Sequence, residues 1–204
     1  MPSTNQQHFI FLDTETTGFD PKSDCIIELA CVKISSDLDV FDIKPNQIFH
    51  TYLKNDTEIR SDSIKIHGIT SDFLKEKPSF SEVYSKFLDF IGDHTLIAHN
   101  AAFDMKFLNA ALAKVDSNPL GNNVIDSLQV ARQLYPGSPV GLDALIKRFQ
   151  MSSRGLHSAL EDATILAKIY SAMCSPKQTG LFVQGGKMDE TPMNFSMCQK
   201  VIKA

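Results

Sequence analysis

The sequence is poor in cysteine and has no long apolar run. Its four cysteines include no C-x-x-C pair, so the sequence indicates neither a zinc ribbon nor a framework of disulfides. No apolar run approaches the roughly 20 residues that cross a bilayer. The polar residues 1–7 also lack the apolar core of a signal peptide. We therefore expect a cytoplasmic protein with reduced thiols and no membrane association.

An excess of basic residues is also lacking. The chain carries 20 Lys and Arg against 24 Asp and Glu, which excludes a protein that wraps duplex nucleic acid through its charge. This acidic balance still fits a nuclease whose carboxylates are neutralised by bound metal. Local cations that could face the phosphates are Arg132, Lys147, Arg148 and Arg154. With 204 residues and 43% hydrophobic content, the chain is long enough to bury one substantial core.

The apolar pattern predicts an α/β fold. Segments rich in Ile, Phe and Val at 8–13, 26–34 and 48–53 are expected to be strands. Helical periodicity and short strands alternate after them. We expect a helix from Pro78 to Ile91, a strand at 96–98, a helix carrying Phe103 to Leu112, a strand at 124–125, a helix that stops before Pro136, and helices near 141–149 and 158–172. This order implies a mixed β-sheet flanked by α-helices.

The composition divides the chain into three parts. Residues 1–174 form the expected folded domain, and residues 175–192 read as a flexible linker because Pro, Gly, Gln and Lys replace periodic apolar positions. In residues 193–204 apolar side chains recur at i, i+4 and i+8, a helical stripe. The stripe consists of Met193, Met197 and Val201. The stripe leaves two alternatives open. Either the tail folds back onto the domain or frays, or it folds on a partner by laying its Met-rich face in a groove.

Two acids follow the first apolar run, residues 9–12. Successive strand side chains alternate between faces, so Asp13 and Glu15 should share a face with their Cα atoms about 6.6 Å apart. Two carboxylates so placed repel each other unless a cation lies between them, and their hard oxygens suit Mg²⁺ or Mn²⁺. The alternative is a polar turn after a buried strand, with Gly18 making the turn.

Two further acids occur in the opening turns of predicted helices. Asp104 could be only a partner of the helix dipole. It precedes Phe107 and Leu108 by three and four residues, however, which places it toward the buried stripe, where a charge needs a partner or a metal. Asp162 likewise precedes Leu166 by four residues.

A histidine stands five residues before the last of these acids. Five residues turn a helix by about 140°, so His157 and Asp162 could not share a face of one continuous helix. We therefore expect His157 in the loop or cap that enters the helix, leaning over the site that Asp162 helps to build. The alternative is a surface or capping histidine.

These residues resemble the three motifs of the DEDDh 3′→5′ exonucleases and, among that family, the epsilon (proofreading) subunits of bacterial DNA polymerase III. The resemblance runs from about residue 8 to residue 172. It includes Asp13-x-Glu15, Asp104 and His157-x₄-Asp162 in the family's order and spacing. Further matching segments are Tyr52-Leu53-Lys54, His67-Gly68-Ile69, Asp126-Ser127-Leu128 and Leu142-Asp143-Ala144-Leu145.

The resemblance implies a ribonuclease-H-like fold and hydrolysis assisted by two divalent cations, Mg²⁺ or Mn²⁺. The implied metal ligands are Asp13, Glu15 and Asp162, with Asp104 completing the cage, and His157 would be the general base. The positions that match nucleotide-binding residues are Asp13, Glu15, Thr16, His67, Asn100, Phe103 and Asp162. Asp62 is a looser match, because the relatives carry Glu there, and Phe103 could instead be a core aromatic.

The linker contains a second pattern. Gln178-Thr-Gly-Leu181-Phe182 resembles the Gln-x-x-Leu-Phe segment by which bacterial proteins bind the sliding clamp. A Leu-Phe pair exposed on a linker should have a pocket to fill. The sliding clamp is therefore an expected partner, and the resemblance makes the polymerase catalytic subunit the expected partner of the tail.

The combined motifs favour a proofreading exonuclease that acts on single-stranded or frayed 3′ ends of DNA. One alternative is a DEDDh exonuclease that trims RNA, such as an oligoribonuclease, although none of these motifs reads a 2′-hydroxyl. A second alternative is a non-catalytic scaffold that joins polymerase and clamp. The scaffold is disfavoured because all four acids and the histidine are present.

Overall fold

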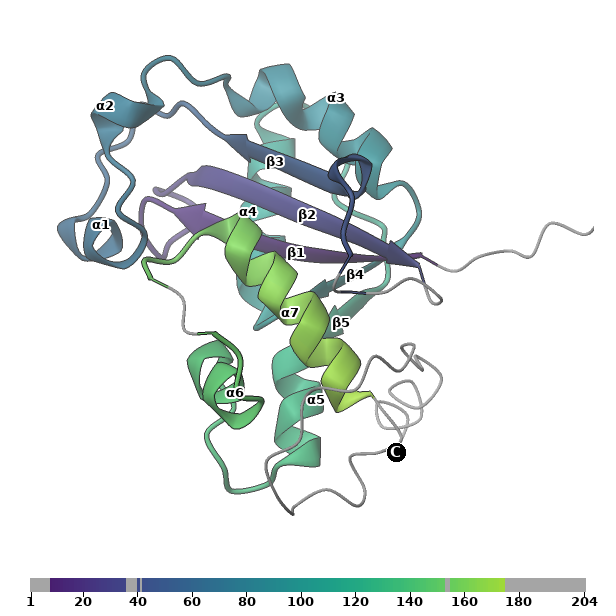
Figure 1. Cartoon of the computed structure of the whole chain (residues 1–204). Coiled ribbons are helices and arrows are strands. Elements are labelled where there is room, and N and C mark those ends of the chain that lie inside the picture. The colour runs from purple at the N-terminus through teal and green to yellow at the C-terminus, as the bar shows by residue number, and fades with distance from the viewer. Residues whose placement is uncertain (1–7, 36–39, 41, 153–154, 175–204) are drawn as a thin grey trace, which may run out of the picture.

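The computed structural model describes residues 8–35, 40, 42–152 and 155–174 (Figure 1). Most of the predicted folded domain, residues 1–174, is therefore described. The predicted linker at 175–192, with its Gln178–Phe182 segment, and the predicted tail at 193–204 lie outside the described residues. The predictions for these two segments stay predictions.

The centre of the fold is a mixed five-stranded sheet, with its strands in the order β3-β2-β1-β4-β5. The strands are β1 (His8–Thr16), β2 (Ile26–Ser35), β3 (Ile48–Tyr52), β4 (Thr95–Ala98) and β5 (Val124–Asp126). Strands β1, β2 and β3 pair antiparallel, whereas β4 pairs parallel with β1 and with β5. The predicted mixed sheet is thus confirmed. Strand β1 is longer than predicted, so Asp13 and Glu15 both lie inside it and not in a turn.

Helices cover both faces of this sheet. They are α1 (Ser61–His67), α2 (Ser71–Leu74), α3 (Phe80–Ile91), α4 (Ala101–Ala113), α5 (Ser127–Leu134), α6 (Leu142–Arg148) and α7 (Ala159–Met173), with a 3₁₀ turn at Pro45–Gln47. The helices from α3 onward match the predicted positions. Helices α1 and α2 were not predicted, because 7 and 4 residues are too few to show a helical period. Among the described residues, no helix is long and apolar enough to cross a membrane.

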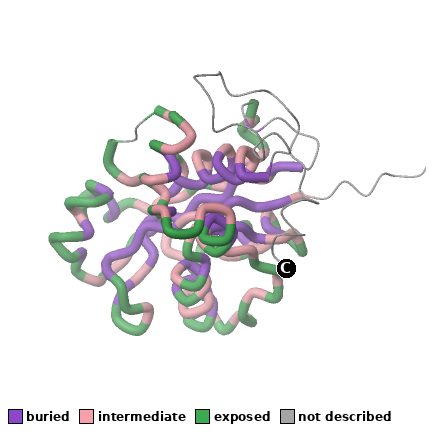
Figure 2. The backbone as a smooth tube through the Cα atoms, turned by 90° about the horizontal axis from the view of Figure 1, so that it is seen from below, coloured by how far each residue is buried: buried purple, intermediate pink, exposed green. Residues whose placement is uncertain are grey.

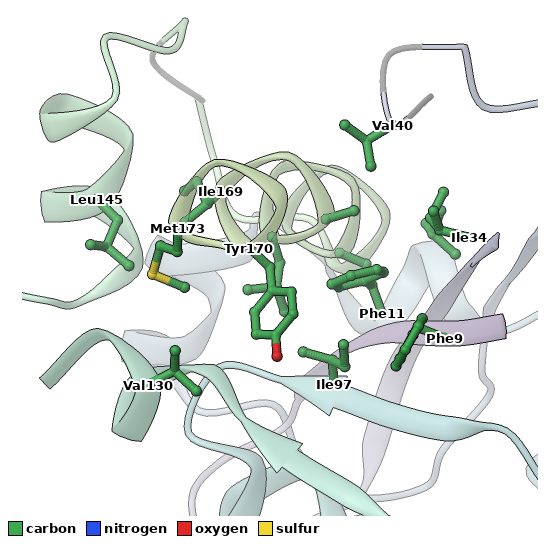
Figure 3. Packing of buried hydrophobic residues seen from close by; sticks show 14 of the residues in the cluster. Phe9, Phe11, Ile34, Val40, Ile97, Val130, Leu145, Ile169, Tyr170 and Met173 are labelled. Carbon is green, nitrogen blue, oxygen red and sulfur yellow. The ribbon is translucent and has the colours of Figure 1, made fainter. Parts of the chain in front are cut away.

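Strand β1 divides the core into two clusters, because its side chains alternate between the faces. Phe9 and Phe11 pack toward α7 and contact the cluster that includes Tyr170 (Figure 3). Ile10 and Leu12 point the other way, into a second cluster with α3 and α4. The strands are therefore buried between the helical layers, while the exposed residues gather at the periphery (Figure 2). The same alternation decides which face each acid of β1 occupies.

Candidate active site

Acidic side chains from both helical layers meet near the carboxyl end of β1. Asp13 and Glu15 occupy the face of β1 that carries Phe9 and Phe11, the face covered by α7. Asp104 belongs to the first turn of α4 and Asp162 to the first turn of α7. Both of these helical acids are only 3% exposed, and aspartates are seldom so deeply buried unless they are paired.

Three of the predicted residues form one compact group. Ligand atoms of Glu15, His157 and Asp162 all lie within 4.8 Å of one another, and the Nδ1 of His157 lies 3.7 Å from a carboxylate oxygen of Asp162. Two of the three residues are buried carboxylates, and the third is a half-buried imidazole. Carboxylate oxygens are hard ligands that suit Mg²⁺ or Mn²⁺, so this donor set fits a divalent cation. Asp13 and Asp104 lie outside this group of three.

Asp104 reaches β1 from the opposite face. The Oγ1 of Thr14, which alternates with Asp13 and Glu15 along β1, donates a hydrogen bond of 2.8 Å to the Oδ1 of Asp104. Burial raises the pKa of Asp104 to about 7, even though the Thr14 hydroxyl favours the ionised form. A carboxylate with so high a pKa in the metal-free protein is a suitable site for a positive charge.

His157 precedes its helix, as predicted. Helix α7 begins at Ala159 with Ser158 as its N-cap, so the imidazole projects from the loop that enters the helix. The backbone N–H of His157 donates to the carbonyl of Ile66 in α1 at 2.9 Å. Leu156 packs so closely on Gly68 that a Cβ there would lie 2.6 Å from its Cδ1. Helix α1, which was not predicted, therefore helps to place His157.

The predicted nucleotide-binding residues have different environments. Thr16 is buried, and its hydroxyl donates to the carbonyl of Gly18 at 2.6 Å. His67 is buried as well, and its Nδ1 accepts from the N–H of Ile69 at 3.0 Å. Burial lowers the pKa of His67, although a hydrogen bond with the backbone of Thr16 acts in the opposite direction. The Asp62 side chain is 79% exposed and pairs with Lys65 at 3.0 Å.

The remaining two predicted residues belong to the start of α4. Asn100 is the N-cap and has a left-handed backbone, with φ 70°, and its N–H donates to the Oδ1 of Asp126 at 3.0 Å. Phe103 is half-buried, with its ring centroid 4.9 Å from that of Phe107. It is therefore partly a core aromatic and partly accessible.

Three exposed apolar side chains next to site residues were not predicted. They are Phe19, which follows the Asp13–Gly18 motif, Ile66, which precedes His67, and Leu156, which precedes His157. Their exposed fractions are 65%, 40% and 59%. The available signal was an apolar residue directly beside a motif residue in an otherwise polar stretch of the sequence.

Comparison with known families and relatives is consistent with this geometry. The RNase T exonuclease family matches residues 10–170. DNA polymerase III subunit epsilon of Rickettsia typhi is 42% identical over 177 residues, which cover 83% of this chain and 75% of that protein. The subunit of the same name from Buchnera aphidicola of Baizongia pistaciae is 38% identical over 204 residues, covering 94% of this chain and 81% of the relative.

Solved structures share the fold. Escherichia coli exonuclease I in complex with a dA16 oligonucleotide matches with a TM-score of 0.72 and 20% identity, over 87% of this chain and 42% of that one. Exonuclease X in complex with 5′ overhanging duplex DNA matches with a TM-score of 0.62 and 24% identity, over 94% of this chain and 99% of that one. At these identities the likeness concerns the fold, and the predicted ribonuclease-H-like fold is confirmed.

Proposed function

We propose a function for this chain on the premise that it belongs to the exonuclease family and is a 3′→5′ exonuclease related to DNA polymerase III epsilon subunits. It removes nucleotides from single-stranded or frayed 3′ ends of DNA with the help of two divalent cations. The observation that carries this proposal is the group formed by Glu15, His157 and Asp162. In such a reaction water is added across the last phosphodiester bond. The products are a nucleoside 5′-monophosphate and a new 3′-hydroxyl end.

The acids are proposed to hold the cations. Glu15 and Asp162 provide oxygens on the α7 face, Asp13 adds a third from the same face of β1, and Asp104 completes the cage from the α4 face. Bound Mg²⁺ or Mn²⁺ would activate the attacking water and stabilise the charge that develops on the leaving 3′ oxygen.

His157 is proposed as the general base. Its side chain is 37% exposed and therefore accessible to water, and its Nδ1 faces Asp162. A carboxylate on one ring nitrogen stabilises the imidazolium that forms when the other nitrogen takes a proton. The Nε2 of His157 would accordingly accept the proton of the attacking water.

The terminal nucleotide is proposed to lie against the residues around this group. His67 lies beside the backbone of Thr16, and Thr16 and Asn100 flank the acids of β1 and α4. Aromatic side chains such as Phe103 and Phe19 can stack on bases without reading their sequence. Asp62 would contribute by turning from Lys65 toward the nucleotide.

A direct test compares two substrates of equal sequence. Labelled DNA with a 3′ mismatch and the matching RNA oligomer are incubated with the full chain in Mg²⁺, in Mn²⁺ and in EDTA. We expect mononucleotides from the 3′ end of the DNA, no release in EDTA, and slower release from RNA. Faster release from RNA would favour the RNA-trimming alternative, and a protein inactive with either metal would favour a scaffold.

The partners are proposed from the relatives' name and from the linker pattern. Residues 193–204 would bind the polymerase catalytic subunit, and Gln178, Leu181 and Phe182 would bind the sliding clamp. Replacing Leu181 and Phe182 by Ala should weaken clamp binding and leave hydrolysis of short single strands intact. Deleting residues 187–204 should abolish co-purification with the polymerase while exonuclease activity survives. Unchanged binding in either experiment would contradict the corresponding assignment.

A further inference from the structure

A buried acid lies beside the active site and has no part in the reaction described above. Glu28 is a residue of β2 whose side chain is 1% exposed, and it is the ladder partner of Glu15 in the β1–β2 pair. A buried carboxylate is costly unless it is fully hydrogen-bonded. The partners of Glu28 therefore indicate why it is there.

The carboxylate of Glu28 connects two strands to the start of α7. Its Oε1 lies 2.8 Å from the Nε2 of His50 in β3 and accepts a hydrogen bond of 3.0 Å from the hydroxyl of Ser158. The backbone N–H of Ala159 donates to the same side chain. Burial alone would raise the pKa of Glu28, but these hydrogen bonds lower it below its ordinary value, so the carboxylate is ionised at neutral pH.

This arrangement replaces the usual cap of α7. A serine N-cap normally accepts a hydrogen bond from the first turn of its own helix. Ser158 makes no such bond, because its hydroxyl donates to Glu28 instead. The anion of Glu28 takes over the cap, where a negative charge interacts favourably with the dipole of a 15-residue helix.

His157 is thereby held from both sides. Its own N–H is bound to the carbonyl of Ile66 at 2.9 Å, and the next residue, Ser158, is bound to Glu28. Asp162 depends less on this anchor, because it lies inside α7, where neighbouring residues such as Leu166 are packed in the core. The imidazole lies outside the helix, so its position depends on the backbone on either side of it.

We propose that Glu28 is a positioning residue of the exonuclease reaction, which holds His157 in place through Ser158 and Ala159. This inference rests on the proposed role of His157 as general base. It assigns to Glu28 no contact with substrate or metal. Replacing Glu28 should therefore lower turnover and leave substrate binding unchanged.

The test is a double-mutant cycle in the full chain, with kcat and KM measured on single-stranded DNA. Glu28→Gln retains the shape and removes the charge, and it should lower kcat by about 10–100-fold, as is typical when a residue that orients a reacting group is replaced. KM should change by less than about twofold. In a His157→Ala background the same substitution should change kcat by no more than about twofold, because the group that it positions is gone.

Two further variants keep the test decisive. Ser158→Ala removes only the hydroxyl that links Glu28 to the loop, and it should also lower kcat, which provides a result even if Glu28→Gln folds poorly. Val130→Ala, in the core on α5, is the control for loss of stability. At an equal loss of Tm it should retain the kcat of the wild type.

The outcomes separate this inference from the proposed function. An inactive wild type, or a fully active His157→Ala variant, would overturn the proposed function itself. If the wild type is active and His157→Ala is impaired, a normal kcat for Glu28→Gln would overturn only the inference. An equal loss in the His157→Ala background would overturn it as well, because Glu28 would then act elsewhere.

Discussion

The starts of α4 and α7 have the same spacing of residues and a different chemistry. Each helix begins with an alanine, Ala101 or Ala159, and each carries a buried aspartate as its fourth residue. Each N-cap is preceded by a histidine, His99 or His157. Both segments therefore have the sequence pattern His-x₄-Asp, and they approach β1 from opposite faces of the sheet (Figure 1).

The difference lies in the caps and in the partners. The N-cap of α4, Asn100, is left-handed with φ 70°, whereas the N-cap of α7, Ser158, is extended with φ −142°. The Nδ1 of His99 lies 2.9 Å from the Ser127 hydroxyl of α5, while His157 lies beside Asp162. The same spacing in the sequence thus does not give the two histidines the same surroundings, because the backbone of the cap decides where the preceding side chain points.

The largest expected effects concern the two aspartates. If both helices contribute metal ligands, Asp162→Asn and Asp104→Asn should each lower kcat by about 10³-fold, which corresponds to a loss of about 4 kcal/mol of transition-state stabilisation. Release of mononucleotides at saturating Mg²⁺ measures this. The exposed Asp93→Asn variant is the control and should be fully active. If Asp104→Asn stayed within tenfold of the wild type, the α4 acid would have only a structural role.

The two histidines should differ clearly. His157→Ala should lower kcat by about 10²–10⁴-fold, as expected for the loss of a general base, while metal affinity changes little. His99→Ala is the matched control and should cost less than about tenfold, because its partner is a hydroxyl of a neighbouring helix. Calorimetric titration with Mn²⁺ separates the roles. A collapse of metal binding in His157→Ala would make this histidine a ligand.

A smaller effect is expected when the hydroxyl of Thr14, which holds Asp104, is removed. Thr14→Val keeps the shape of the side chain and removes the hydrogen bond to Asp104, so kcat should fall by about 10-fold or somewhat more. Thr51→Val, whose hydroxyl bonds only a backbone carbonyl of β3, should have normal kcat. Equal rates for the two variants would show that Asp104 needs no support from β1.

The smallest effect is on the stability of the metal-free protein. Because Asp104 has an ordinary pKa of 3.8 in the unfolded chain and about 7 in the folded protein, only the unfolded chain releases this proton between those values. The free energy of unfolding therefore falls as the pH rises through this range, and levels off above it. In EDTA, the fall in Tm from pH 6 to pH 7 should be about 3 °C smaller for Asp104→Asn, equivalent to about 1 kcal/mol.

A control and a contrary result complete this stability experiment. The Asp93→Asn variant should follow the wild type at every pH, because that side chain is fully exposed. A Tm of Asp104→Asn that falls as steeply as that of the wild type would show that burial of Asp104 has little energetic weight in the metal-free protein.

Most of the fold was predictable from local patterns. The strands and the longer helices agreed with the expected positions, because alternation and helical periodicity are properties of neighbouring residues. The exceptions were the short helices α1 and α2 and the extension of β1 to Thr16. Polar strand residues such as Asp13 and Glu15 carry no apolar alternation, so the end of β1 could not be located in this way.

The sequence by itself determined the identity and spacing of the acids and the position of His157 just before α7, since these depend on a few adjacent residues. Only the tertiary structure decided which side chains meet. Thr14 and Asp104 are 90 positions apart, and Glu28 and Ser158 are 130 positions apart. Such hydrogen bonds form only when the sheet is assembled and both helical layers are packed on it, because no local pattern specifies contacts between residues so far apart in the sequence. The partners that orient the site are therefore a property of the fold as a whole.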